Sequence, residues 1–355
     1  MVNLSVQKAL EGVRKDAQLV VDGRTELLAP LRGKHLFVSG GTGFLGTWLL
    51  EILSVLNHDF GFGTQVTVHS RNSLAFAERW PHLGKLSWIR FLDGDIRNLS
   101  ELPRDISFLI HTAAITDRRH FSTQPTAVAE TNIFGTARIL KACLWLENLE
   151  KFTLLSSGLV YGTQPWDSER IQENYMGPLR CNETMAVYAE SKRAAETFAQ
   201  AAISESKLPV VVLRPFAFVG PFQSLELPWA VTDFIRDSLN GGPIRIMGDG
   251  LTVRSILYGS DFAYSVLAAT ASATARSIYN LGSPEPVDLK SLATMITRAF
   301  SPTPEVQTRV GQIGHDRSRL VPDTSAIERD LKFRVTVPLE TAIQKTIDWH
   351  RLVRA

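Results

Sequence analysis

The sequence of 355 residues is short of cysteine, of excess charge and of long apolar runs. Its two cysteines, Cys143 and Cys181, are too few for a disulfide framework, and no cysteine or histidine spacing resembles a zinc site. A formal net charge of +2, with both signs interspersed, gives no field for nucleic acid or anionic lipid. No apolar run approaches the ~20 residues that cross a membrane, and the N-terminal residues lack the layout of a signal peptide. We therefore expect a cytoplasmic globular protein with no metal and with no nucleic-acid or membrane partner.

From residue 34 onward, apolar segments of strand length alternate with segments of helix length. Strands are predicted over residues 35–39, 65–69, 86–92, 106–111, 151–156 and 210–214. Helices are predicted over residues 44–56, 127–148 and 188–205. Apolar strands separated by helices indicate a parallel sheet covered on both faces. The sequence therefore predicts an α/β, Rossmann-like doubly wound domain over residues 33–215.

The two ends of the chain differ from this alternating region. Residues 3–30 carry apolar side chains at roughly helical intervals, which predicts a helical arm over residues 1–32 packed on the core. A partly disordered tail is the alternative. After Pro215, proline, glycine and aromatic residues become frequent, and shorter elements follow. We expect residues 216–355 to form mainly a smaller substrate-binding lobe, with some segments returning to the sheet.

Gly40, Gly43 and Gly46 stand between the first predicted strand and the first predicted helix, in the pattern G-x-x-G-x-x-G. Glycine permits a positive φ in a tight turn and lets the backbone approach a pyrophosphate closely. The helix that begins near Gly43 supplies free N–H groups and the positive end of its dipole. This turn, including Phe44 and Leu45, is therefore predicted to bind a dinucleotide.

The second strand ends in Val-His-Ser70-Arg71 and offers no acidic residue. An NAD site usually places aspartate or glutamate here to accept from the ribose 2′-hydroxyl. Arginine instead suits a phosphate dianion, which it can bind through two hydrogen bonds. Ser70 and Arg71 therefore favour NADP(H), while NAD(H) stays open and Arg71 could also be a solvated loop residue.

Tyr188 and Lys192 are four residues apart at the start of a predicted helix, so their side chains share one face. A tyrosine with a pKa of ~10 is a poor base at neutral pH, but a neighbouring ammonium lowers that pKa. Ser157, at the end of the strand 151–156, can share the substrate hydroxyl. Together with the glycine turn, these three residues predict hydride transfer between a nicotinamide and a carbinol, with Tyr188 as acid and base.

From residue 34 to the end, these motifs resemble the extended short-chain dehydrogenases/reductases of the nucleotide-sugar epimerase/dehydratase family. The resemblance implies an NAD(P)-dependent enzyme. It places Asp95 and Ile96 in the adenine pocket, and Ala113 and Ala114 beside the ribose and pyrophosphate. It also assigns cofactor-site positions to Asn132, the family's structural asparagine, and to Tyr188, Lys192 and Pro215.

The same resemblance extends to substrate and partner. Residues 247–261 are similar to the stretch that these enzymes lay along the nucleotide diphosphate, which makes Arg254 a phosphate ligand; a surface salt bridge is the alternative reading. Arg317 and Arg319 resemble a second basic contact. The helices near 127–148 and 188–205 resemble a pair buried in a two-fold interface, which implies a homodimer; the same side chains could instead face the protein's own sheet. The interface set is Ile133, Ala137, Leu140, Leu144, Ala194, Phe198 and Ala201.

Two departures from the family pattern narrow the reaction. Sugar 4,6-dehydratases resembling this family carry Asp-Glu where this chain has Gly158 and Leu159, and the decarboxylases keep the glutamate. Neither residue here can carry a proton, so elimination lacks its acid and base. What remains is oxidation or reduction at one carbinol, expected at sugar C4, by a 4-keto reductase. The alternatives are an NAD-dependent 4-epimerase, a reductase of a non-sugar alcohol or ketone, and a non-catalytic dinucleotide sensor.

Overall fold

The computed structural model describes residues 4–308 and 318–354, and its centre is a seven-stranded sheet. The strand order is β10-β6-β5-β4-β1-β2-β3, and every neighbouring pair is parallel. These strands are β1 (His35–Ser39), β2 (Gln65–Ser70), β3 (Ile89–Asp93), β4 (Phe108–His111), β5 (Lys151–Leu155), β6 (Val210–Pro215) and β10 (Ile278–Leu281). The predicted doubly wound parallel sheet is confirmed. Its direction of growth reverses between β1 and β4, where such folds open a crevice.

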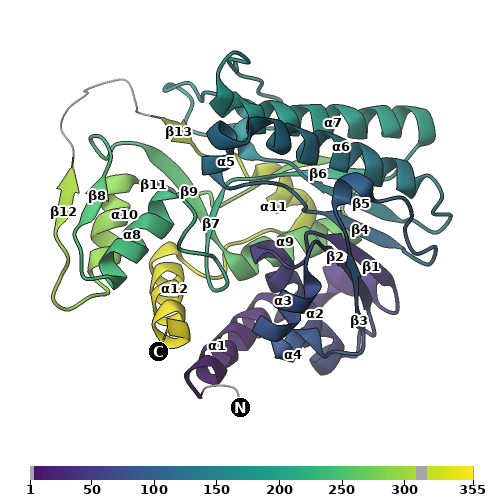
Figure 1. Ribbon diagram of the computed structural model, residues 1–355, viewed down its shortest axis with the longest axis horizontal. Helices are drawn as coiled ribbons and strands as arrows, with labels where there is room; N and C mark the ends of the chain where they lie inside the picture. The colour runs from purple at the N-terminus through teal and green to yellow at the C-terminus, as the bar shows by residue number, and fades with distance from the viewer. Residues whose placement is uncertain (1–3, 309–317, 355) are drawn as a thin grey trace.

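Helices cover both faces of the sheet (Figure 1). Helices α6 (Pro125–Cys143) and α7 (Val187–Ser206) pack together on one face, and α2 (Phe44–Phe60) and α9 (Gly259–Ser272) on the other. Side chains alternate along each strand, so Phe37 joins the α6/α7 core while Leu36 and Val38 join the α2/α9 core. Two apolar layers thus hold the sheet rigid beneath the ends of its strands.

The N-terminal residues form α1 (Leu4–Val21) and a short 3₁₀ helix, η1 (Thr25–Leu31). α1 packs on α2, α9 and the final helix, α12 (Leu339–Arg354). The buried Asp16 carboxylate accepts a hydrogen bond from the Tyr258 hydroxyl at 2.7 Å and pairs with the Lys345 ammonium at 2.8 Å. The arm is therefore attached to the second lobe as well as to the sheet.

The second lobe is organised around β9 (Val253–Tyr258), which pairs with β7 (Ala217–Val219), β11 (Pro286–Asp288) and β13 (Arg319–Leu320). A separate pair joins β8 (Ile244–Ile246) to β12 (Val306–Thr308). Helices α8 (Ala230–Leu239) and α10 (Leu289–Thr297) belong to this lobe, whereas α11 (Ser325–Leu331) packs on β10 and α9 of the main domain. After β9, the chain leaves the second lobe: α9 packs on the main sheet and β10 pairs with β6 of that sheet. The chain then returns to the second lobe with β11.

Several predicted boundaries move in the structure. The strand predicted from Leu86 begins at Ile89, because the backbone first closes turns from Leu86 to Leu83 and from Ile89 to Leu86 after α3 (Ser73–Arg79) and α4 (Pro81–Gly84). Pro125 occupies the first turn of α6 and starts that helix early, since its missing N–H costs nothing there. No helix in the described part of the chain is long and apolar enough to span a membrane.

Candidate active site

A cavity opens over the carboxyl ends of β1, β2, β4, β5 and β6. Most of the predicted cofactor residues line it, although they come from segments spread over 176 positions between Gly40 and Pro215. These are Gly40, Gly43, Phe44, Leu45, Gly46, Ser70, Arg71, Asp95, Ile96, Ala113, Ala114, Tyr188, Lys192 and Pro215. Parallel strands bring these distant segments together because all their carboxyl ends lie on one edge.

The glycine turn is shaped by backbone contact. Gly40 has a φ of +70°, and a Cβ there would lie 2.9 Å from the Ala113 backbone. A Cβ on Gly46 would lie 2.3 Å from the Gly41 backbone, so the start of α2 packs directly on the turn. Gly43 caps α2 without any side-chain hydrogen bond among the described residues, which leaves first-turn N–H groups for a ligand. The turn therefore fits the pyrophosphate of a dinucleotide.

The end of β2 carries hydroxyl groups and a cation. The Ser70 and Thr42 hydroxyls lie 2.8 Å apart, and the Arg71 side chain is exposed at the cavity rim. The neighbouring carboxylates are already engaged: Asp93 accepts from the Ser73 N–H at 2.9 Å, and Asp95 binds Arg97.

Asp95 lines the cavity but is held by Arg97. Its carboxylate accepts from the Arg97 backbone N–H at 2.9 Å and from the guanidinium at 2.7 Å. These hydrogen bonds from Arg97 lower the pKa of Asp95 to about 2, so it is ionised at neutral pH. Asp95 therefore faces the cavity as a charged acceptor, and it caps the N-terminus of the short 3₁₀ helix η2 (Ile96–Asn98) that follows β3.

Asn132 does not line the cavity and is instead buried beneath it. It is buried between α6 and α7, where its Nδ2 donates to the Ser191 hydroxyl at 2.9 Å. Ser191 in turn donates to the backbone carbonyl of Tyr188 at 2.8 Å. Asn132 is thus placed to support the first turn of α7 rather than to touch a cofactor.

The structure brings Ser157, Tyr188 and Lys192 together at the end of β5. The Ser157 hydroxyl hydrogen-bonds to the Tyr188 phenol and accepts from the Leu159 N–H at 3.1 Å. The Lys192 ammonium donates to the Leu155 carbonyl at 2.8 Å and lies 5.9 Å from the centroid of the Tyr188 ring. All three side chains are buried.

The electrostatics of Tyr188 differ from the expectation. Burial raises its pKa to about 12, and the hydrogen bond from Ser157 opposes that rise only in part. Burial also lowers the pKa of Lys192 to about 8, while Glu196 raises it. The predicted lowering of the tyrosine pKa by Lys192 is not found in this protein. The reason is that both groups are desolvated and the ammonium is directed to a backbone carbonyl.

Sequence reasoning missed Phe121, on the short helix α5 (Arg118–Thr123). Its ring stacks on the Tyr188 ring with centroids 4.8 Å apart and an interplanar angle of 12°. The available signal was an aromatic residue a few positions after Ala114, in the connection between β4 and α6, where an ordinary loop would be polar.

Arg254 lies on β9, in the second lobe and outside the cavity lining described above. Its guanidinium donates to the Val253 carbonyl at 2.8 Å and to the Ser318 hydroxyl at 2.8 Å. Among residues 4–308 and 318–354, no carboxylate forms an ion pair with Arg254. The alternative role of Arg254, as part of a surface salt bridge, is therefore not supported. Burial, together with the nearby Arg118 guanidinium, lowers the pKa of Arg254 to about 10. This leaves a charged, largely buried cation whose partners are neutral.

The second predicted basic contact with the substrate consists of Arg317 and Arg319. Arg319 lies on β13, beside β9, and donates to the Glu169 carbonyl at 3.0 Å. Arg317 lies outside the described residues. The structure therefore places Arg319 at the edge of the sheet that carries Arg254, with its side chain directed to a backbone oxygen.

The glycine turn, the parallel sheet and the Ser-Tyr-Lys set together define an extended short-chain dehydrogenase/reductase. The family model described as "NAD dependent epimerase/dehydratase family" matches residues 36–282, and the chain belongs to that family. It is therefore an enzyme of a class that uses a pyridine nucleotide, and the resemblance predicted from the motifs is confirmed.

Relatives in this family catalyse several reactions. The chain is 28% identical over 334 residues to a dTDP-glucose 4,6-dehydratase of Streptomyces niveus, covering 90% of this chain and 94% of the relative. It is 26% identical over 319 residues to UDP-glucuronic acid decarboxylase 1 of Xenopus tropicalis, covering 90% of this chain and 72% of the relative. A solved structure of UDP-glucuronic acid 4-epimerase from Bacillus cereus, in complex with UDP-glucuronic acid and NAD, shares the fold, with a TM-score of 0.77. That structure is 22% identical, and the match covers 90% of this chain and 99% of that one.

Proposed function

We propose that the protein is a nucleoside-diphosphate-sugar 4-keto reductase, in which Ser157, Tyr188 and Lys192 act at one carbinol. The supporting observation is that this set is assembled while the two adjacent positions carry no acid. A Cβ on Gly158 would lie 3.1 Å from the ring of Phe216, and Leu159 packs in the apolar cluster around Tyr188. A dehydratase or decarboxylase needs a proton-transfer group that this chain does not supply there.

The chain's own residues account for the proton steps. A reduced nicotinamide, when bound, supplies the hydride to the carbonyl carbon of the 4-keto sugar. Tyr188 donates its phenolic proton to the carbonyl oxygen as the C–H bond forms, so that the C=O double bond becomes a C–OH group. Ser157 hydrogen-bonds the same oxygen and orients it, Lys192 holds the end of β5 through the Leu155 carbonyl, and solvent returns the proton to Tyr188.

The cofactor proposed is NADP(H). Arg71, exposed at the cavity rim after β2, supplies a cation for the 2′-phosphate, and residues 65–71 contain no acid that would repel it. The Ser70 and Thr42 hydroxyls, 2.8 Å apart, stand beside it as neutral donors. NAD(H) would instead have to bind without the usual carboxylate for its ribose hydroxyls.

The substrate proposed carries a nucleoside diphosphate, held by Arg254. Several kcal/mol are needed to bury a cation without an anionic partner, so such a cation indicates an anionic ligand. Arg118 reinforces the positive potential, since it lowers the pKa of Arg254. The relatives described above, a UDP-glucuronic acid decarboxylase and a dTDP-glucose 4,6-dehydratase, agree with this substrate class.

A 4-epimerase is the second candidate, supported by the fold shared with a solved 4-epimerase. The two candidates differ in their use of cofactor. The reductase should oxidise NADPH stoichiometrically when mixed with a nucleoside-diphosphate 4-keto sugar, measured by the loss of nicotinamide absorbance. An epimerase should instead interconvert two C4 epimers of a nucleotide sugar with no net cofactor change, and that result would replace the reductase assignment.

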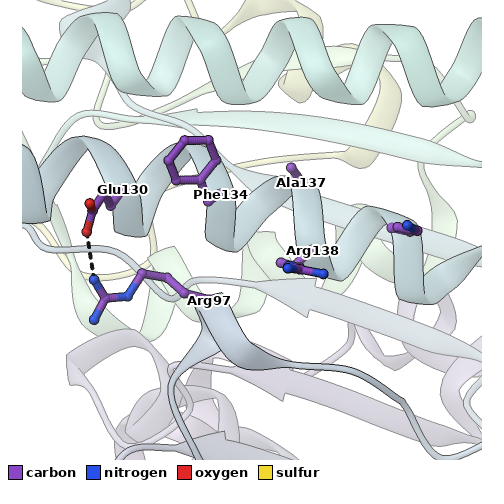
Figure 2. A pocket seen from close by; sticks show the side chains of 6 residues that line it. Arg97, Glu130, Phe134, Ala137 and Arg138 are labelled. Atoms are coloured by element: carbon purple, nitrogen blue, oxygen red, sulfur yellow. Dashed lines mark hydrogen bonds and ion pairs between the residues drawn. The ribbon is translucent and has the colours of Figure 1, made fainter.

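We also propose a homodimer formed through α6 and α7. Figure 2 shows Phe134, Ala137 and Arg138 along α6, beside the Glu130–Arg97 ion pair. Phe134 is 56% exposed and Phe198 of α7 is 43% exposed, which are large apolar rings for a free surface. Leu140, assigned to the interface from its spacing, is buried against the protein's own sheet instead.

Light scattering at micromolar concentration tests this assembly. The expected mass is twice that of the chain, and Phe134→Glu should reduce it to a single chain because the substitution places a charge at the centre of the apolar face. A matched exposed substitution away from this face, Leu74→Glu, should leave the mass unchanged. A single-chain mass for the unmodified protein would contradict the homodimer.

A further inference from the structure

The connection between β4 and α6 places an aromatic ring directly on the catalytic tyrosine. Phe121 and Tyr188 stack face to face, 4.8 Å between centroids and 12° from parallel, and their side chains are 2% and 7% exposed. The position of Phe121 is fixed by α5, which Asp117 caps by accepting from the Arg119 N–H at 2.9 Å. α5 also packs on α6 and on η4 (Thr184–Ala186), the turn that leads into α7.

Apart from Ser157, Lys192 and the cavity that Tyr188 lines, the side chains packed around the Tyr188 ring are apolar. Val128 completes the buried cluster, and Ile115, Leu159 and Val187 pack against it. Water is therefore kept from the ring, and an ionised phenol would gain no solvation there. The titratable and charged residues on the elements packed here are Arg118, Arg119 and His120 of α5, Glu130, Arg138 and Lys141 of α6, and Glu190, Lys192, Arg193, Glu196 and Glu205 of α7. Among the described residues, the Ser157 side chain is the polar group that lowers the pKa of the phenol.

Stacking adds an electrostatic effect to exclusion of water. The face of an aromatic ring carries partial negative charge, so a parallel ring at stacking distance repels the extra charge of a phenolate. The neutral phenol has no such penalty and packs at full van der Waals contact. Phe121 therefore opposes loss of the proton from Tyr188 in two ways that act in the same direction.

We propose that Phe121 is a positioning residue for Tyr188, whose stacked ring fixes the phenol against Ser157 and keeps it in the neutral, proton-donating form. This inference rests on the proposed function in taking Tyr188 as the acid of the reaction. It deepens that function by naming the side chain that keeps Tyr188 in the protonation state in which it meets the carbonyl substrate. A tyrosine held as an acid delivers its proton to a carbonyl oxygen that is receiving a hydride, whereas the reverse reaction would need the phenolate.

The experiment reads the ionisation of Tyr188 without any substrate. The full-length protein is labelled with carbon-13 at the ζ carbon of its six tyrosines, and the Tyr188 signal is assigned by its loss in Tyr188→Phe. In the unmodified protein, this signal should remain at the neutral-phenol position at about pH 11. In Phe121→Ala it should be about half ionised at that pH, a gain in acidity of roughly tenfold, because water reaches the exposed ring face.

Two further variants separate stacking from general loss of packing. Val128→Ala removes apolar volume from the same cluster but leaves the stack, so the Tyr188 titration should stay within about twofold of the unmodified protein. Phe121→Leu keeps apolar cover without an aromatic face, and it should give a smaller gain of about threefold. This variant retains most of the volume, so it remains readable if Phe121→Ala does not fold.

An unchanged titration of Tyr188 in both Phe121 variants would overturn the inference, as would an equal shift in Val128→Ala. Either result is separate from a failure of the proposed function. Full activity of Tyr188→Phe towards a nucleoside-diphosphate 4-keto sugar and NADPH would remove the acid assignment itself, whatever the titration of the phenol.

Discussion

The two lobes of this enzyme build their sites from different parts of the chain. On the cofactor side, backbone meets backbone, as at Gly46, where an added Cβ would lie 2.3 Å from Gly41. On the side of the proposed substrate site, the prominent feature is a side chain, Arg254, held by neutral oxygens on a short sheet. The first site depends on close backbone contacts, whereas the second depends on one long side chain that a single substitution can change. The comparison indicates that the proposed cofactor site depends on backbone geometry, whereas the proposed substrate site depends on the identity of a side chain.

The chemistry between the two lobes should give the largest effect. Tyr188→Phe keeps the ring that stacks on Phe121 and removes only the hydroxyl, so turnover should fall by roughly 10²–10⁴. Cofactor affinity, measured by quenching of protein fluorescence, should change little, since the glycine turn is untouched. Thr197→Ala, which removes an exposed hydroxyl from the same helix outside the cavity lining, serves as the control. Turnover of Tyr188→Phe close to the unmodified enzyme would show that another group transfers the proton.

The substrate side is tested by Arg254→Ala. Loss of a charge-assisted hydrogen bond to phosphate should cost about 2–3 kcal/mol, which raises KM for the nucleotide sugar by roughly 30- to 150-fold with little change in kcat. NADPH affinity should stay constant, because Arg254 does not line the cofactor cavity. Arg298→Ala removes an exposed arginine of the same lobe and should change neither quantity. A fall in kcat alone would place Arg254 in the chemical step and contradict a pure binding role.

Because the proposed cofactor site is built from close backbone contacts, a single added methyl group should disturb it strongly. Gly46→Ala forces a Cβ against the Gly41 backbone, so it should cost at least about 1–3 kcal/mol in stability and weaken dinucleotide binding. Gly12→Ala is the matched control, because a Cβ there meets nothing within 4 Å and the residue lies inside α1. That control should be neutral or stabilising by about 0.5–1 kcal/mol in thermal unfolding. Equal melting temperatures for the two variants would refute the close packing at Gly46.

The smallest expected effect concerns cofactor choice, where a side chain at the rim modifies a backbone-built site. Arg71→Ala should weaken NADPH binding by about tenfold or more and leave NADH binding nearly unchanged, because only NADPH has the 2′-phosphate. Arg90→Ala, an exposed arginine on β3, controls for loss of surface charge. If the unmodified enzyme binds the two cofactors equally, the preference for NADP(H) is wrong and the epimerase becomes the better assignment.

Local sequence patterns carried much of the prediction, for identifiable reasons. Alternating apolar strands and helices determine a parallel sheet, since both faces of each strand must be covered. The role of the glycines in the turn can be predicted from the sequence because larger residues do not fit the backbone of such a turn. The pairing of Tyr188 with Lys192 can be predicted because residues four apart in a helix lie on the same face. By contrast, the start of β3 at Ile89 depended on turns that pattern alone does not resolve.

The sequence by itself determined the class of this enzyme and its reacting groups, because those depend on residue type and short spacing. Only the tertiary structure decided what surrounds them. It set Phe121 on Tyr188 across 67 positions of sequence, left Arg254 without a carboxylate in the described chain, and moved Asn132 beneath the site. It also made burial, rather than Lys192, the main influence on the pKa of Tyr188. Solvation and stacking arise from contacts between distant segments, and the physical reason they escape prediction is that no local spacing records them.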